Sequence, residues 1–182
     1  MRFLLFIFII VSICACSNNK ALQDKLEILY SRPVLFPDSG MIRVDCQPNK
    51  YCNADTLMPE YKLIVFVGPK ECSTCAIKSM SEWNTFLNIE REGKIQLTFI
   101  INPSKLKLND IVSSYRTSGL EHSIYIDTCG IFLQQNPHIP ESSTFHVLLL
   151  DKKDSVLLVG NPIHNEKIQT LLYERINLKK EE

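Results

Sequence analysis

The chain has 182 residues and carries equal numbers of basic and acidic residues, so its formal net charge is zero. Without a basic excess or a basic stripe it lacks the electrostatic footprint of a nucleic-acid-binding protein, and no nucleic-acid partner is predicted. Its length suits a single domain with its own hydrophobic core.

The first sixteen residues have the pattern of a bacterial lipoprotein signal peptide. Arg2 supplies a positive start, residues 3–11 form an unbroken apolar run, and residues 12–16 form a small-residue exit. The apolar run is too short to span a bilayer, which takes about 20 residues. The run Ile13-Cys14-Ala15-Cys16 resembles the lipobox, in which a small residue precedes a cysteine that is diacylated and becomes the new N-terminus.

We therefore expect residues 1–15 to be the signal peptide and Cys16 to be the lipidation site. Residues 16–32 would form a lipidated tether with a short helix, and residues 33–182 the folded domain. The predicted location is the periplasmic side of the bacterial cell envelope, with the lipid as membrane anchor. Because no Asp follows Cys16, outer-membrane attachment is favoured. An ordinary signal peptide cut near Ala15 is the alternative, and it also exports the domain.

Apolar periodicity predicts helices and strands in a regular order along the rest of the chain. Residues 63–67 are apolar without alternation, as in a strand that is buried on both faces. The predicted elements are a helix at 20–30, strands at 41–44 and 62–67, a helix from 75 to a stop at 93, a strand at 95–101, a helix near 108–115, a strand at 123–127, a short helix at 131–135, hairpin strands at 145–150 and 156–159, and a helix at 166–176.

Cys72 and Cys75 lie where the buried strand 62–67 gives way to a helix. At a helix N-terminus, unpaired N–H groups and the positive end of the dipole favour a thiolate, which is the attacking species in disulfide exchange. Cys72 is the candidate nucleophile and Cys75 the candidate resolving thiol. Ser73 and Thr74 place two hydroxyl groups between them, which we expect to cap the helix rather than donate to sulfur.

Five cysteines follow the predicted lipidation site, and three of them lie outside the CxxC motif. Because the number is odd, one thiol is left without a partner. Cys46 and Cys52 flank a turn-prone stretch and are a candidate structural disulfide, although spacing alone does not give their geometry. We expect Cys129 to be a buried apolar side chain, with a resolving or regulatory thiol as the alternative.

The order strand, CxxC helix, strand, helix, strand, helix, hairpin and helix resembles the thioredoxin fold over about residues 61–179. It is most similar to the membrane-tethered TlpA/ResA-like thiol-disulfide oxidoreductases. The resemblance implies an α/β fold with a central mixed sheet, helices on both faces and an N-terminal β extension. It also implies exchange with disulfides or thiols of client proteins and a membrane electron donor, with the redox-active disulfide itself in place of a cofactor.

Three positions depart from that pattern. Phe145 stands where the superfamily carries a cis-proline, so we expect a trans peptide bond there. His146 would lie near the thiols, where an imidazolium would stabilise the Cys72 thiolate; the alternative is a half-buried strand histidine with a backbone partner. Phe66 stands in place of the buried acid of thioredoxin. Glu71 is the nearest acid, and we expect it to face solvent.

Two other functions compete with disulfide exchange. Cys72, Cys75 and His146 together offer the soft ligands that Cu(I) prefers, although copper-delivering thioredoxin-fold proteins have a wider cysteine spacing. The chain could also be a binding lipoprotein in which the CxxC is a static disulfide. It has no second CxxC, HExxH or P-loop motif, so no other metal site is predicted.

Overall fold

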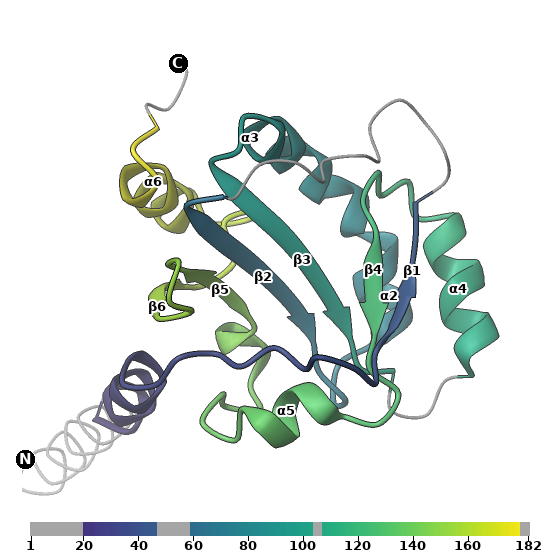
Figure 1. The fold of residues 1–182 in the computed structure, drawn as a ribbon, viewed down its shortest axis with the longest axis horizontal. Coiled ribbons are helices and arrows are strands. Elements are labelled where there is room, and N and C mark those ends of the chain that lie inside the picture. Colours follow the sequence, from purple (N-terminus) through teal and green to yellow (C-terminus); the bar gives the residue numbers. More distant parts are fainter. Residues whose placement is uncertain (1–19, 47–58, 104–106, 179–182) are drawn as a thin grey trace, which may run out of the picture.

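The computed structural model describes residues 20–46, 59–103 and 107–178 (Figure 1). The predicted signal peptide, Cys16 and Cys52 lie outside these residues, and their roles stay predictions. No helix within the described ranges is long and apolar enough to cross a membrane.

Residues 20–30 form a helix, as their leucine spacing predicts. The elements that follow are β1 (Ile42–Val44), β2 (Tyr61–Val67), α2 (Ser73–Lys78), the 3-10 helix η1 (Met80–Phe86), α3 (Leu87–Arg91), β3 (Ile95–Ile101), α4 (Leu108–Arg116), β4 (Ile124–Ile126), α5 (Ile131–Gln135), the 3-10 turn η2 (Ser143–Phe145), β5 (Val147–Leu150), β6 (Val156–Val159) and α6 (Glu166–Arg175).

The strands of the described residues all belong to one six-stranded sheet with the order β1-β4-β3-β2-β5-β6 (Figure 1). Strands β2, β3 and β4 run parallel, while β5 is antiparallel to β2 and β6 is antiparallel to β5. Strand β1 extends the sheet as an antiparallel partner of β4. The predicted mixed sheet, terminal hairpin and N-terminal β extension are therefore confirmed.

Different helices and segments cover the two faces of the sheet. Helices α2, α4 and α6, together with η1 and α3, supply side chains to a core that includes Val65 and Phe99 of the sheet. The opposite face, with Ile64 and Phe66, is covered by α5, by Leu29 at the end of the helix at 20–30, and by the extended segment that follows it. Helices on both faces are confirmed, but on the second face α5 has only five residues and the helix at 20–30 packs only through its last turns.

The long helix predicted after Cys75 is instead three shorter segments, α2, η1 and α3. Its buried side chains recur every three residues, at Ile77, Met80, Trp83 and Phe86. A repeat of three matches the turn of a 3-10 helix, in which residues i and i+3 lie directly above each other. The predicted buried face instead began at Ala76, which is half-buried, and continued at spacings of four, three and four residues. Those spacings are typical of an α-helix, so the prediction of one long α-helix was wrong.

The parallel strands end level with one another, which determines where the loops meet. Val67 at the end of β2 pairs in register with Ile101, and Ile101 pairs with Ile126. The segments that follow β2, β3 and β4 therefore leave the sheet at the same edge. The carboxyl edge of parallel strands is the usual place for a functional site in open α/β sheets, and the CxxC motif lies there.

Candidate redox site

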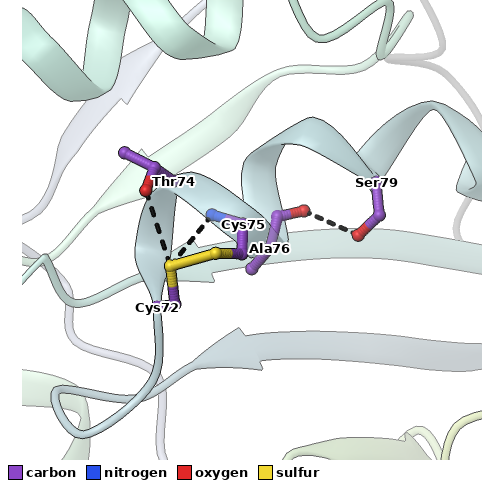
Figure 2. The surroundings of a disulfide bond; sticks show 5 residues. All are labelled: Cys72, Thr74, Cys75, Ala76 and Ser79. Carbon is purple, nitrogen blue, oxygen red and sulfur yellow. Dashed lines mark hydrogen bonds between the residues drawn. A yellow bond between two sulfur atoms is a disulfide. The ribbon is translucent and has the colours of Figure 1, made fainter.

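Cys72 and Cys75 form a disulfide at the start of α2, with their Cα atoms 5.3 Å apart (Figure 2). Both cysteines are exposed. The pair follows strand β2 by one short turn. Every residue from Leu63 to Val67 is buried, so the strand that leads into this turn is held firmly in the core. Sulfur atoms that are open to solvent at a helix start are accessible to an attacking thiolate.

Cys72 itself occupies the N-cap position of α2, and its Sγ accepts the backbone N–H of Cys75 at 3.4 Å. The hydroxyl of Thr74 lies 3.5 Å from the same sulfur (Figure 2). Because Cys72 carries no proton in the disulfide, Thr74 is the donor. The prediction that Ser73 and Thr74 cap the helix is therefore wrong: the cysteine caps, Thr74 donates to sulfur, and Ser73 is buried.

Glu71 turns inward, contrary to the prediction that it faces solvent. Its Oε1 accepts the backbone N–H of Gly68 at 2.7 Å and lies 2.6 Å from Nδ1 of His146. Burial raises the pKa of Glu71, but the hydrogen bonds from His146 and Gly68 and the charge of His146 together outweigh it. The pKa of this carboxyl group therefore lies below its usual value.

His146 is 2% exposed and directly precedes β5 rather than lying within the strand. Its Nε2 lies 2.9 Å from the carbonyl oxygen of Pro140, and its ring contacts Phe66 edge to face with centroids 4.9 Å apart. Its own carbonyl oxygen accepts the N–H of Phe66 at 2.9 Å. The predicted backbone partner is confirmed, although His146 is fully buried and lies before the strand. Its predicted effect on the Cys72 thiolate stays a prediction.

Phe145 belongs to η2 and is buried in the core of the second face. No peptide bond among the described residues is cis, which agrees with the trans bond expected before Phe145. The hairpin strand begins at Val147, two residues later than predicted, because Phe145 and His146 form the 3-10 turn and its end.

The other cysteines are separate from the CxxC pair. Cys129 is a free, exposed thiol in the segment after β4, so the prediction of a buried apolar side chain is wrong. Cys46 is buried just after β1. Because Cys52 lies outside the described residues, the pairing of Cys46 with Cys52 stays a prediction.

The copper alternative requires an imidazole nitrogen of His146 that is free to face the thiols. Both ring nitrogens are engaged, one by Glu71 and the other by Pro140. In the part of the chain that the structure describes, no three His, Cys, Asp or Glu side chains are grouped as a metal site would require. This arrangement does not offer the three-ligand site on which the alternative depends.

The parallel strands, the CxxC at the first helix and the closing hairpin define a thioredoxin-like fold. A thioredoxin-like protein solved in solution in its oxidised form superposes with a TM-score of 0.51 at 14% identity, over 78% of this chain and 94% of that one. A PrxQ variant from Xylella fastidiosa gives 0.46 at 12% identity, over 75% and 99% of the two chains. A thioredoxin-like protein from Bacteroides caccae gives 0.44 at 14% identity, over 82% and 53%.

No protein-family model and no curated protein matches the sequence. Similarity at this level of identity shows the fold, and function has to be argued from the site. The exposed disulfide on a thioredoxin-like scaffold supports chemistry of the thiol-disulfide oxidoreductase type.

Proposed function

We propose that the protein is an exported, lipid-anchored thiol-disulfide oxidoreductase whose active pair is Cys72 and Cys75. The observation that carries the proposal is the exposed disulfide at the start of α2, with Cys72 at the N-cap. In the reduced state, the N–H of Cys75 and the hydroxyl of Thr74 would face a Cys72 thiolate. Hydrogen bonds to the charged form of a group favour that form.

The proposed reaction begins when the Cys72 thiolate attacks a disulfide of a client protein. One client sulfur leaves as a thiolate, and Cys72 is held in a mixed disulfide with the other. The Cys75 thiolate then attacks Sγ of Cys72 and releases the second client thiolate. The client gains two electrons, and the Cys72–Cys75 pair loses them and is oxidised. A dithiol donor at the membrane would return these electrons in the reverse exchange.

The direction of exchange depends on the reduction potential of the pair relative to its compartment. We propose the reducing direction, by analogy with membrane-tethered oxidoreductases of this fold. The lipid anchor rests on the pattern of residues 1–16. A Cys16→Ser variant should move the protein from the membrane fraction to the soluble periplasmic fraction.

Equilibration with glutathione or dithiothreitol redox buffers, followed by thiol trapping, tests the function. We expect the pair to cycle reversibly and to reduce insulin, Cys72→Ser to abolish activity, and Cys75→Ser to accumulate a mixed disulfide with its client. Cys129→Ser is the matched control, because it removes an exposed thiol outside the pair and should leave the activity unchanged. A pair that resists reduction under these conditions would show a static disulfide and refute the proposal.

A further inference from the structure

His146 joins the turn that leads into the CxxC pair to the segment that precedes β5. One is the turn from Gly68 to Glu71 that leads into Cys72, which is closed by the N–H of Glu71 donating to the carbonyl of Gly68 at 3.0 Å. The other runs from Pro140 to the start of β5. The imidazole contacts both, through Glu71 on one side and the Pro140 carbonyl on the other.

The hydrogen bonds determine where the protons of this pair lie. A carbonyl oxygen only accepts, so Nε2 of His146 carries a proton that it donates to Pro140. Oε1 of Glu71 accepts the N–H of Gly68, and the pKa of this carboxyl group lies below its usual value, so it is ionised at neutral pH. Nδ1 of His146 then carries the second proton and donates it to the same oxygen. This geometry is that of an imidazolium with Glu71 as its counterion, and such a pair has no net charge.

The neighbouring ion pair of Lys70 and Glu141 is too exposed to have the same effect on Cys72 as Glu71 and His146. Lys70 and Glu141 form an ion pair at 2.5 Å, but their side chains are 70% and 73% exposed, so solvent and salt screen them. The side chain of His146 is 3% exposed and that of Glu71 is 26% exposed. An unbalanced charge at Glu71 or His146 would act on the adjacent Cys72 with much less screening.

We propose that the Glu71–His146 ion pair sets the ionisation of Cys72, with His146 cancelling the carboxylate that directly precedes the nucleophile. This inference rests on the proposed redox function. An uncompensated carboxylate beside Cys72 would disfavour the thiolate, because like charges repel. His146 is thus a positioning residue that acts through Glu71. The ring of His146 contacts Phe66, the residue that stands in place of the buried acid of thioredoxin.

The test compares Glu71→Gln, His146→Gln and the double variant, each with Cys75→Ser and Cys129→Ser so that Cys72 is the thiol that reacts at the site. The rate of alkylation is followed against pH. We expect His146→Gln to lower the thiolate-to-thiol ratio of Cys72 at neutral pH by roughly threefold or more, because the Glu71 carboxylate is left uncompensated. The double variant should restore the ratio, since both charges are gone.

Glu71→Gln should leave the thiolate-to-thiol ratio unchanged or raise it. Glu141→Gln is the matched control, because Glu141 belongs to the exposed Lys70–Glu141 ion pair and directly follows Pro140. It should change the thiolate-to-thiol ratio much less than His146→Gln does. A purely structural role predicts that the double variant is at least as impaired as the single ones. Failure of the double variant to restore the ratio, or shifts of both single variants in the same direction, would overturn the proposal.

A measurement on the unaltered protein covers the case in which His146→Gln does not fold. The ¹⁵N chemical shifts of His146 should show both ring nitrogens protonated at neutral pH, and a neutral ring would overturn the inference. Failure of the wild-type pair to exchange with redox buffers would instead refute the proposed function. The two failures are therefore distinguishable.

Discussion

Glu71 links the thiol site to the stability of the fold. Its pKa is lowered in the folded protein, so it stabilises the native state at pH values above the pKa of an unfolded glutamate, about 4.3. This contribution is lost as the pH falls through the lower, folded pKa.

We expect Glu71→Gln to reduce the free energy of unfolding by about 1 to 3 kcal/mol at neutral pH, the usual range for hydrogen bonds to a charged group. The difference between wild type and variant should begin to shrink as the pH falls below about 4.3, the pKa of an unfolded glutamate, and should vanish only below the lower pKa of the folded protein. Urea unfolding at a series of pH values measures both curves. A difference that stays constant down to acidic pH would contradict this account.

At the scale of single residues, the sequence identifies the chemistry but not its local partners. The spacing of Cys72 and Cys75 suffices to predict that the two form a disulfide. The inward turn of Glu71 is not predictable in the same way, because its partner His146 is 75 residues away in the chain. The presence of an acid beside Cys72 and a histidine before the hairpin was the available signal, and only the packing of β5 against β2 brings them together.

Asn136 fastens the extended N-terminal segment to α5. It is fully buried, its Oδ1 accepts the N–H of Leu35 at 2.7 Å, and its Nδ2 donates to the carbonyl oxygens of Leu35 at 2.7 Å and Phe132 at 2.8 Å. The side chain thus supplies both hydrogen bonds that a neighbouring strand would otherwise make to Leu35.

We expect Asn136→Ala to lower the free energy of unfolding by about 2 to 4 kcal/mol, because three hydrogen bonds are lost and buried groups are left unpaired. Asn161→Ala is the matched control: this exposed asparagine accepts one N–H, from Ile163, and its loss should cost less than about 1 kcal/mol. Equal costs in chemical denaturation would show that Asn136 does not hold the segment.

At the scale of elements, the sequence predicts the type and order of nearly all strands and helices. The apolar runs at β2 and β3 leave little ambiguity, and β1 and β4 follow from short β-branched stretches. The segments α2, η1 and α3 fail as one predicted helix because residues 76–87 contain two overlapping apolar repeats. Which repeat is buried depends on contacts such as Trp83 against Phe99, whose ring centroids lie 6.0 Å apart.

Across the whole molecule, the helix at 20–30 is tied to the core by its last turn, while most of its residues are exposed. Leu29 in the helix at 20–30 is fully buried against the second face, whereas Leu22, seven positions earlier, is 46% exposed. The leucine spacing predicts the helix, but a single short helix does not reveal which core its last turn joins.

We expect Leu29→Ala to lower the free energy of unfolding by about 2 to 4 kcal/mol, as truncation of a core leucine does. Leu22→Ala should change it by less than about 0.5 kcal/mol, because a substitution at an exposed position rarely matters. Thermal and urea unfolding compare the two directly. If both variants keep wild-type stability, the helix at 20–30 is not part of the cooperative unit.

Gly68 lies so close to His146 and Glu71 that a larger residue does not fit at this position. A Cβ atom built there would lie 2.8 Å from Cε1 of His146 and 3.2 Å from Oε1 of Glu71. No real Cβ tolerates the first contact, and the enclosed ring has little freedom to move away. Among related sequences, glycine at this position should accompany the histidine and the acid, and larger residues should enter only where the histidine is gone. The three positions would then be inherited as a unit.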